Sequence, residues 1–428
     1  MRSVLLALIS LVAACAHPSP WPSPPSAAAP VVRAPLRAGT SGDYPPLSVW
    51  KDDHVEGFAP ALVTAFASAE KREVRWTRFD WPGLSEDLRA GRFDLAADGI
   101  TVRPERSIGG RFTVPIARGG AVLLLRRPAW ALPAQEGAPL LASIDRAGLR
   151  VVVNQGGHLE RVARGLLHLA DIRAIADNDA VRSAFVRGEA DAAMTNTFEA
   201  PRWAAGAPGV EQIGPLTQDV TAIWMRADRG EVADRLDEWL LDEEESGRLA
   251  ALRARWLGQG AGPRAASPVS ALLAATAERL ALMPFVAAAK QRTGTAVEDV
   301  GQEERVIASS ASAVVSAATK RGSPPPPRAA VEAFFRAQIE AAKAVQRHVA
   351  SASAMRGFSL DDELRPAIAR ISARMALLVV RVPRGTQGGA VVAEARVDLA
   401  SSGLELEQID RVAAAIAALG DVEIPAPR

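Results

Sequence analysis

The chain has 428 residues, enough for two or three domains, and 48% of them are hydrophobic, so it can bury sizeable cores. Its formal net charge is +1 and no basic stripe is interleaved with aromatic residues, which argues against nucleic-acid binding. The single cysteine excludes an intrachain disulfide, and the five scattered histidines form no ligand cluster. We therefore expect no metal and no cofactor.

The N-terminus is typical of an exported protein. Residues 1–15 are read as a signal peptide, because a short positive start precedes an apolar run at 4–13 that is too short to span a membrane. Its last residues, VAAC, resemble a bacterial lipobox in which Cys15 is lipidated; ordinary cleavage at the same small residues is the alternative. Residues 16–35 are rich in Pro, Ser and Ala and predict an extended tether. We expect a periplasmic protein that touches the membrane only through this lipid anchor, since no other hydrophobic run looks long enough.

From residue 36 short strands alternate with amphipathic helices, a pattern that predicts parallel α/β sheets. The first set is expected at 36–40 (strand), 59–69 (helix), 74–79 (strand), 81–90 (helix) and 93–97 (strand). The second set is expected at 149–154 (strand), 158–169 (helix), 172–176 (strand), 180–187 (helix) and 190–195 (strand). A helix over 235–257 ends this part of the chain.

Residues 259–268 are rich in Gly, Pro and Ala and indicate a linker, after which the strand pattern stops. A helical domain is expected over 269–380. Its four helices are predicted at 270–290, 298–318, 328–351 and 361–380. The tail 381–428 is left without a role, and one short helix is predicted in it at 406–419.

The third of these helices carries an unusual polar face. Gln338, Ala342 and Gln346 recur every four residues, so they lie on one side of the helix. Two stacked amides make a poor apolar core but can hold a polar ligand. Arg279 and Lys290 are likewise spaced to project from one helix face, although such a pair alone is more often a solvated surface.

Several short motifs stand out in the first domain: TSGDYPP at 40–46, DWPGL at 80–84, GRFD at 91–94, RPER at 103–106, VNQGG at 153–157 and MTNTFEA at 194–200. Through them residues 36–258 resemble the family 3 periplasmic solute-binding proteins and, within these, the cyclohexadienyl (prephenate/arogenate) dehydratases. The resemblance implies two α/β lobes that close by a hinge motion over a ligand. It also implies that 121–126 and 220–226 are the strands crossing between the lobes.

The same resemblance implies roles for residues of the cleft. Arg106 matches the carboxylate-binding arginine, Asn154 a substrate-contacting asparagine, and Glu199 the proton donor. A glycine pair ahead of a helix is a natural anion site. The further substrate-binding candidates are Thr101, Gly156, Gly157, Trp81 and Asn196.

Glu199 has two interpretations. As a general acid it must stay protonated near neutral pH, which requires a desolvated site that raises its pKa. Alternatively, Asn196 and Glu199 form a capping box and Glu199 only closes a helix N-terminus. Asn196 stands where amino-acid binders carry an aspartate, which weakens the interpretation as an amino-acid receptor. His158 is expected either to contact a carboxylate or to lie exposed at the start of its helix.

The helical domain carries AERL at 277–280, VAAAK at 286–290, VED at 297–299, QEERV at 302–306 and FFRAQIEAAKAVQ at 334–346. These segments resemble exported AroQ-type chorismate mutases, which are all-helical. The resemblance implies that Arg279 and Arg365 bind carboxylates. It further assigns Lys290 and Gln346 to the ether oxygen of chorismate and Glu303 to its hydroxyl. Gln302 replaces an arginine of many relatives, and Arg305 is the candidate substitute.

Together the resemblances imply an α/β two-lobed domain followed by an all-α mutase domain in one exported bifunctional enzyme. It would convert chorismate to prephenate, and prephenate to phenylpyruvate with loss of water and carbon dioxide, for phenylalanine biosynthesis. One alternative is a periplasmic receptor for an amino or keto acid with a mutase-like helical domain. Another is an inactive mutase domain that serves as a dimerisation bundle. If the protein is a homodimer, the mutase domain is the expected interface.

Overall fold

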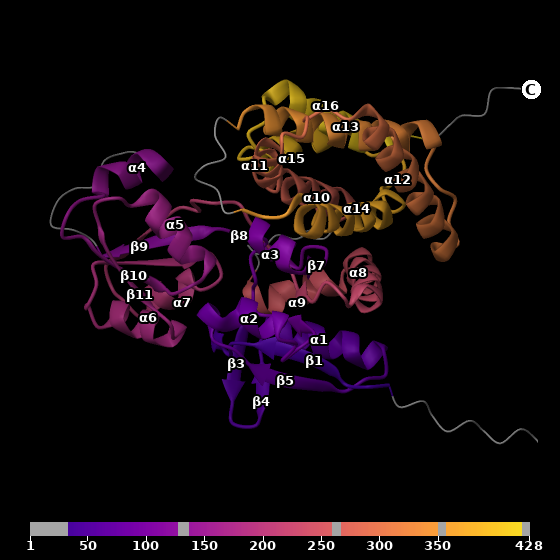
Figure 1. Cartoon of the computed structure of the whole chain (residues 1–428). Helices are drawn as coiled ribbons and strands as arrows, with labels where there is room; N and C mark the ends of the chain where they lie inside the picture. The colour runs from indigo at the N-terminus through magenta and orange to yellow at the C-terminus, as the bar shows by residue number, and fades with distance from the viewer. Residues whose placement is uncertain (1–32, 127–136, 259–266, 350–356, 422–428) are drawn as a thin grey trace, which may run out of the picture. The chain divides into compact units, whose positions relative to one another are not determined.

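The computed structural model describes residues 33–126, 137–258, 267–349 and 357–421 (Figure 1). The expected signal peptide with Cys15 lies outside these residues, as do most of the tether and most of the linker 259–268. Within the described residues the predicted class is confirmed, because two α/β lobes are followed by helices alone.

The first lobe is built on a five-stranded sheet with the strand order β5-β1-β6-β15-β7. Strand β1 runs parallel to β5 and β6, whereas β15 runs antiparallel to β6 and β7. The strands of this sheet are β1 (Leu36–Thr40), β5 (Val74–Arg78), β6 (Leu95–Ala96), β15 (Trp224–Met225) and β7 (Arg111–Phe112). The lobe also holds a small sheet of β2 (Asp43–Tyr44), β3 (Ser48–Lys51) and β4 (His54–Glu56). Its helices are α1 (Phe58–Ala69), η1 (Trp81–Gly83), α2 (Leu84–Arg89), α3 (Pro104–Gly109), α8 (Gly230–Glu245) and α9 (Arg248–Leu257).

The second lobe repeats this arrangement with the strand order β11-β10-β12-β9-β13. Its strands are β11 (Asp171–Ile175), β10 (Arg150–Asn154), β12 (Ala192–Asn196), β9 (Ala121–Arg126) and β13 (Val210–Ile213). Its helices are α4 (Gly137–Ile144), α5 (His158–Leu166), α6 (Asn178–Val186) and α7 (Ala200–Ala205). Separate apolar clusters cover the two faces of the sheet, which explains the nearly continuous apolar runs of its central strands.

The strands that join the lobes differ from those expected. They are β8 (Ala117–Gly119) and β14 (Asp219–Thr221), which pair antiparallel with Thr221 opposite Ala117. The predicted crossing 121–126 is wrong, because it forms β9 inside the second sheet, and the predicted crossing 220–226 splits into β14 and β15. An apolar run alone cannot distinguish a central strand from a crossing strand.

Helices make up the rest of the described chain: α10 (Pro268–Ala281), α11 (Met283–Thr293), α12 (Val300–Arg321), α13 (Arg328–Arg347), the π-helical turn η2 (Leu360–Leu364), α14 (Arg365–Val379), α15 (Gly388–Asp398) and α16 (Leu406–Ala418). The helix expected at 270–290 is interrupted at Leu282, because Pro284 starts a new helix there. The helix expected at 235–257 is likewise interrupted at Gly247, whose φ is +80°. The tail holds two helices rather than one, and α16 packs against both α15 and α13.

The stretch Pro268–Thr293 is long and apolar enough to cross a membrane by composition, with a mean hydropathy of 1.5. However, 72% of that window is buried inside the protein, as expected for the core helix of a bundle. The prediction that no further hydrophobic run is long enough to span a membrane is therefore wrong for this stretch. Its burial explains why so apolar a helix occurs here.

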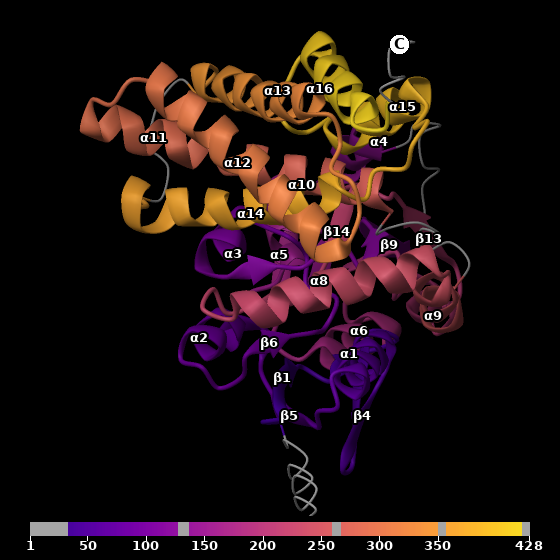
Figure 2. The same cartoon turned by 90° about the vertical axis from the view of Figure 1, so that its right-hand side faces the viewer.

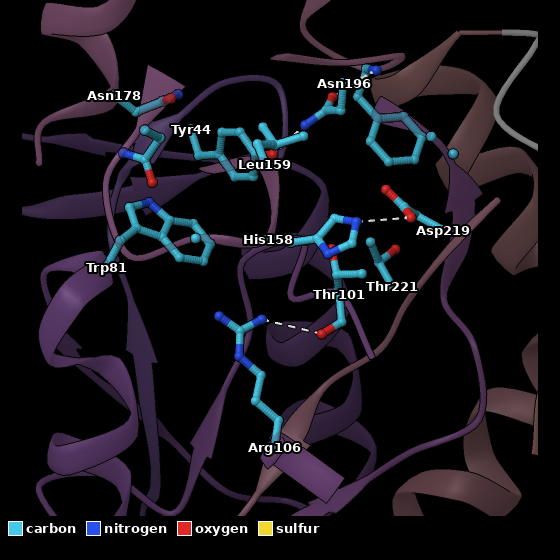
Figure 3. A pocket seen from close by; sticks show the side chains of 16 residues that line it. Tyr44, Trp81, Thr101, Arg106, His158, Leu159, Asn178, Asn196, Asp219 and Thr221 are labelled. Atoms are coloured by element: carbon cyan, nitrogen blue, oxygen red, sulfur yellow. Dashed lines mark hydrogen bonds and ion pairs between the residues drawn. The ribbon is translucent and has the colours of Figure 1, made fainter. Parts of the chain in front are cut away.

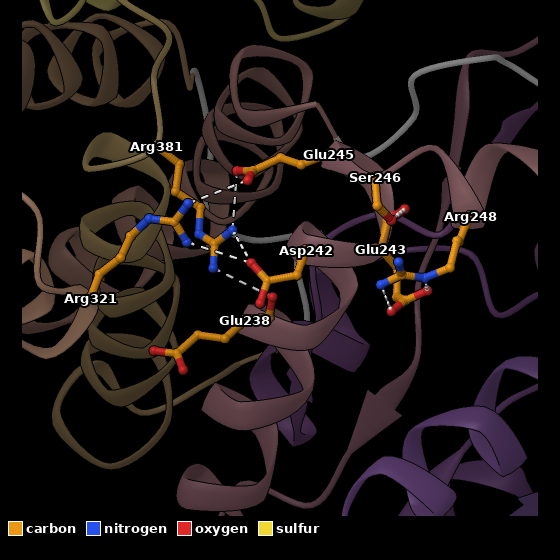
Figure 4. A network of polar contacts seen from close by, with 8 residues as sticks. All are labelled: Glu238, Asp242, Glu243, Glu245, Ser246, Arg248, Arg321 and Arg381. Atoms are coloured by element: carbon orange, nitrogen blue, oxygen red, sulfur yellow. Dashed lines mark hydrogen bonds and ion pairs between the residues drawn. The ribbon is translucent and has the colours of Figure 1, made fainter.

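The bundle and the first lobe share one continuous cluster of buried apolar residues. Helix α14 packs against α3 and α8 (Figure 2). Its buried Arg374 donates to the backbone oxygen of Phe112 and pairs with Glu278 of α10. A second set of ion pairs joins Arg321 and Arg381 to acidic residues of α8, with 2.7 Å between Arg381 and Asp242 (Figure 4).

Candidate active site

A narrow cleft lies between the two lobes (Figure 3). The residues predicted from sequence that line it are Trp81, Thr101, Arg106, Asn154, Gly157 and Asn196. The lining also includes residues for which no site role was predicted: Leu159, Asn178, Phe198, Asp219 and Thr221.

Arg106 lies in this cleft without a negatively charged partner. It belongs to α3, its side chain is buried, and one guanidinium nitrogen donates to the backbone oxygen of Thr101 at 3.1 Å. Its Nε has no hydrogen-bond partner, and none of the ion pairs among the described residues includes Arg106. Burial lowers the pKa of Arg106 well below its usual value, because the charged form is removed from water. A buried guanidinium with free donors is a strong binding group for a carboxylate.

The turn between β10 and α5 supplies a polar wall of the cleft. The Asn154 side chain donates to a backbone oxygen 3.2 Å away and lines the cleft together with Gly157. Gly156 has a φ of +72°, and a Cβ there would lie 2.9 Å from the Cα of Pro82 in the other lobe. Its N–H donates to Glu160 at 2.8 Å, so this amide is not free for a substrate carboxylate. Gly157 is therefore the glycine of the pair that faces the cleft.

An aromatic corner forms the wall on the side of the first lobe. The rings of Tyr44 and Trp81 meet edge to face, with 5.4 Å between their centroids. The indole Nε1 of Trp81 is buried without a hydrogen-bond partner, so it is a free donor beside the cleft. From the other lobe the Asn196 side chain donates to the Tyr44 hydroxyl. This contact joins the two lobes across the ligand site.

His158 and Asp219 meet at the edge of the cleft (Figure 3). The Nε2 of His158 lies 3.0 Å from an oxygen of Asp219, and 17% of the His158 side chain is exposed. The histidine thus contacts a carboxylate of the protein itself and is not an exposed residue at a helix start. The hydrogen-bonded pair thus lies at the start of β14, beside the cleft.

Glu199 lies behind the cleft wall and is fully buried. Its Oε1 accepts from the side chain of Asn178 at 2.7 Å, and its Oε2 accepts from the hydroxyl of Thr195 at 2.8 Å. Asn178 lines the cleft, whereas Glu199 does not, so the structure places the predicted acid one residue deeper than expected. The carboxyl makes no capping bond to the start of α7. The capping-box interpretation of Glu199 therefore does not describe this side chain.

The surroundings of Glu199 favour its protonated form. Burial raises the pKa of Glu199 to about 8, and the nearby carboxylates of Asp43 and Asp179 act in the same direction. Hydrogen bonds from Thr195 and Asn178 act against this rise. The side chain is mostly protonated at neutral pH, which is the state that a general acid needs.

The amide face expected on the third helix of the bundle is present. Gln338 and Gln346 of α13 are both buried, and their Oε1 atoms have no hydrogen-bond partner. The side-chain nitrogen of Gln338 donates to the hydroxyl of Thr276 at 3.0 Å, and its backbone oxygen accepts from Arg279 at 2.8 Å. Since most buried polar atoms are paired, two unpaired amide oxygens indicate a place for a polar ligand.

Arg279 is a buried cation of the bundle. Only 8% of this residue is exposed, and burial lowers its pKa to about 10. No ion pair within the described part of the chain includes Arg279. Like Arg106 in the cleft, it is a guanidinium that an anionic ligand can neutralise.

Lys290, Glu303 and Arg365 come from three elements and interact electrostatically. Burial lowers the pKa of Lys290, the charge of Arg365 adds to this effect, and Glu303 opposes it. Glu303 accepts a hydrogen bond from Lys343 at 3.1 Å, and Arg365 is half-exposed and paired with Asp361. The charges of Arg365 and Glu303 therefore act on Lys290, and Arg365 itself lies at the surface.

Gln302 and Arg305 lie on the exposed side of α12. The guanidinium of Arg305 donates to the side-chain oxygen of Gln302 at 2.9 Å. Both residues face solvent, so their position does not support the idea that Arg305 replaces an active-site arginine. Among the described residues no group of three or more His, Cys, Asp or Glu side chains is arranged to hold a metal ion.

Comparison with known families supports the two-domain architecture. Residues 36–259 match the family model of bacterial extracellular solute-binding proteins, family 3. The chain belongs to this family. A second match, to chorismate mutase type II, covers residues 270–347, which hold α10 to α13. The solute-binding domain is thus followed by a mutase-type helical domain in one chain.

Individual relatives match the solute-binding domain. Cyclohexadienyl dehydratase of Pseudomonas aeruginosa is 30% identical over 225 residues, which cover 52% of this chain and 82% of that protein. The ABC transporter arginine-binding protein 1 of Escherichia coli K12 is 24% identical over 223 residues, 51% of this chain and 85% of that protein. A solved ancestral amino-acid-binding protein, described as a precursor of cyclohexadienyl dehydratase, is 26% identical with a TM-score of 0.47 and covers 52% of this chain and 95% of that one.

Proposed function

We propose that this chain is a bifunctional enzyme that rearranges chorismate to prephenate and converts prephenate to phenylpyruvate, water and carbon dioxide. One observation supports the dehydratase activity most strongly. The solute-binding domain places an unpaired buried cation, Arg106, in its cleft and a carboxyl, Glu199, directly behind the cleft wall, and burial raises the pKa of Glu199 to about 8. An amino-acid receptor has no use for a protonated acid beside its ligand, whereas a dehydratase requires one.

The dehydratase step uses these groups as follows. Arg106 binds a carboxylate of prephenate, and Trp81 and Tyr44 lie against its ring. Glu199 gives its proton to the ring hydroxyl, which leaves as water. The bond to the ring carboxylate breaks at the same time, and its electron pair makes the ring aromatic as carbon dioxide leaves. Since catalytic contacts often tighten only with substrate present, the position of Glu199 behind Asn178 is compatible with this role.

The mutase step needs no proton donor and no covalent intermediate. The ether C–O bond of chorismate breaks while a C–C bond forms, so the site must hold a compact conformer and stabilise charge on the ether oxygen. Arg279 binds a carboxylate. Lys290 and Gln346 donate to the ether oxygen, and Glu303 accepts from the hydroxyl. The burial of the Arg279 guanidinium, which has no ion-pair partner among the described residues, supports its assignment to a carboxylate.

Purified protein supplied first with chorismate and then with prephenate tests the proposal. We expect phenylpyruvate from both substrates, at rates above an enzyme-free control. Release from prephenate only would leave the helical domain without mutase activity. Release from neither substrate, together with measurable amino-acid binding, would favour the receptor alternative.

Location and assembly are part of the same proposal. We infer a periplasmic protein whose Cys15 carries the lipid anchor and whose mutase domain forms a homodimer. The motif VAAC and the extracellular character of the family support export. Membrane fractionation of the native protein and of Cys15→Ser tests the anchor, because only the native protein should sediment with membranes. Sedimentation of the soluble protein at one-subunit mass would contradict the dimer.

A further inference from the structure

Asn178 bridges the two lobes beside Glu199. It is the first residue of α6 in the second lobe and only 2% exposed. Its backbone N–H donates to a carboxylate oxygen of Asp43 at 2.9 Å, and its side-chain nitrogen donates to the backbone oxygen of Asp43 at 3.2 Å. The same nitrogen donates to Glu199 at 2.7 Å. Asp43 belongs to β2 of the first lobe, so two of these three bonds cross the cleft.

Asp43 is itself fixed within the first lobe. Its second carboxylate oxygen accepts from the hydroxyl of Ser41 at 2.5 Å. The backbone N–H of Ser41 and the hydroxyl of Ser48 both donate to buried Asp98, each at 2.5 Å. None of the ion pairs among the described residues includes Asp43, although the residue is only 7% exposed. Asp43 thus presents a carboxylate with a defined position, and its partner on the opposite lobe is Asn178.

The arrangement uses both hydrogens of the Asn178 amide at once. One is directed to the backbone oxygen of Asp43 and the other to the carboxyl of Glu199, while the Asp43 carboxylate holds the backbone N–H of Asn178. Because Asp43 and Asn178 lie on different lobes, separating the lobes would break the first contact and free the amide to rotate. The carboxyl of Glu199 would then lose a donor that fixes its orientation. Lobe closure and the orientation of Glu199 are therefore joined through one side chain.

We propose that Asp43 is a positioning residue which, acting through Asn178, fixes the Glu199 carboxyl for proton donation when the lobes close on the substrate. This inference rests on the proposed role of Glu199 as the acid. It adds that catalysis requires a residue of the opposite lobe that does not touch the reacting atoms. A well-oriented group matters because a small misplacement of a reacting group lowers the rate strongly.

The charge of Asp43 affects the pH dependence of dehydratase turnover, which a purely structural role would not change. The groups facing Glu199 are Asp43 and Tyr44 from the first lobe and Asp179 from α6, while Arg202 of α7 lies close to Asp179. Asp43 and Asp179 both favour the protonated carboxyl by like-charge repulsion. Removing either charge should lower the pH at which dehydratase turnover declines.

Three variants separate position from charge in the full-length protein. Asp43→Ala removes the charge and the carboxylate that fixes the backbone N–H of Asn178, while the backbone oxygen that accepts from the Asn178 side chain stays. Asp43→Asn removes the charge but keeps a side-chain acceptor for that N–H. Asp179→Asn is the matched control that removes a charge outside the bridge. We expect Asp43→Ala to lower kcat for prephenate by about 10²-fold, with a much smaller change in KM. Asp43→Asn should recover kcat at acidic pH, with its alkaline decline shifted to lower pH. Asp179→Asn should show that shift alone.

Native kcat in Asp43→Ala at every pH would overturn the inference. Equal loss in Asp43→Ala and Asp43→Asn at acidic pH would also overturn it, because the role would then be structural. If Asp43→Ala fails to fold, Asp43→Asn decides: an unshifted alkaline decline, beside a shifted one in Asp179→Asn, contradicts the proposal. Glu199→Gln distinguishes the underlying claim, since native turnover in that variant would remove Glu199 as the acid whatever Asp43 does.

Discussion

The side-chain oxygen of Asn196 accepts the backbone N–H of Glu199 at 3.0 Å, while the carboxyl of Glu199 turns away from that contact toward Asn178 and Thr195. Asn196 therefore fixes the turn that leads into α7. A carboxylate used for capping lies at a helix N-terminus and is stabilised in its charged form. Glu199 is instead buried and held in its neutral form, which is the property that the dehydratase reaction needs.

The pH dependence of the two activities should differ. Because burial raises the pKa of Glu199 to about 8, dehydratase turnover should stay level from mildly acidic pH and fall as the pH rises through about 8. Mutase turnover should not share this decline. Rates with prephenate and with chorismate across that range, corrected for the enzyme-free reaction, check the expectation. A decline at the same pH for both substrates would point to unfolding.

The same proton affects stability. Glu199 keeps its proton to about pH 8 in the folded protein, but in the unfolded chain it loses it near its usual pKa of 4.5. The folded state binds more protons in this window, so the free energy of unfolding falls as the pH rises from about 4.5 to about 8. Glu199→Gln lacks this pH-dependent loss. Between these pH limits its free energy of unfolding should therefore rise, relative to that of the native protein, by on the order of 4 kcal/mol.

Denaturant unfolding of both proteins at pH 5 and at pH 8 measures that gain. Other buried acids, such as Asp98, whose pKa burial raises to about 6, are common to both proteins and cancel in the difference. A difference between the proteins that is the same at both pH values would show that Glu199 is ionised in the fold.

Arg279→Ala should abolish most mutase activity and spare the dehydratase. We expect a fall in kcat/KM for chorismate of about 10²–10³-fold, the size found for loss of a charge-stabilising donor. Removing this buried cation leaves no partner charge behind and loses the hydrogen bond to the backbone oxygen of Gln338, so we expect only a small loss of stability. Arg328→Ala is the control, since Arg328 is exposed and its ion-pair partner among the described residues is Glu332. Loss of dehydratase activity in Arg279→Ala would contradict the division of labour.

The pair Arg374–Glu278 should stabilise the packing of the bundle against the first lobe. Both side chains are 4% exposed, and Arg374 also donates to the backbone of β7. Arg374→Met leaves Glu278 as a buried unpaired charge and should cost about 3–5 kcal/mol. Adding Glu278→Leu should recover most of the loss, as measured by denaturant unfolding. Equal stability of the single variant and the native protein would show that this pair is open to solvent.

The sequence predicted the alternating strands and helices of both lobes well, because period and punctuation are local signals. It failed where a choice depended on tertiary partners. The apolar segment 121–126 is a central strand because β12 and β13 flank it, and no local pattern shows this. Helix α15 escaped prediction because its burial is limited to two small positions, Val391 and Ala395, and gives little periodicity.

Prediction of the cleft was similarly divided. Arg106, Asn154 and Trp81 were found because motifs mark them, and the structure brings them to one cleft. Asn178 was missed because Asp177-Asn178-Asp179 reads as an ordinary helix start, and Asp177 does cap α6. Only the three-dimensional contact with Asp43 and Glu199 gives Asn178 its significance. Gly156 was assigned to anion binding, but its N–H is taken by the first turn of α5.

The most direct test of the account supplies chorismate to Glu199→Gln and follows both products. Glutamine keeps the size of Glu199 and one of its two hydrogen-bond acceptors but has no acidic proton to give. We predict that prephenate accumulates at the native rate, while phenylpyruvate formation falls by about 10²–10⁴-fold. Formation of phenylpyruvate at the native rate would contradict the account, as would failure of a folded variant to form prephenate.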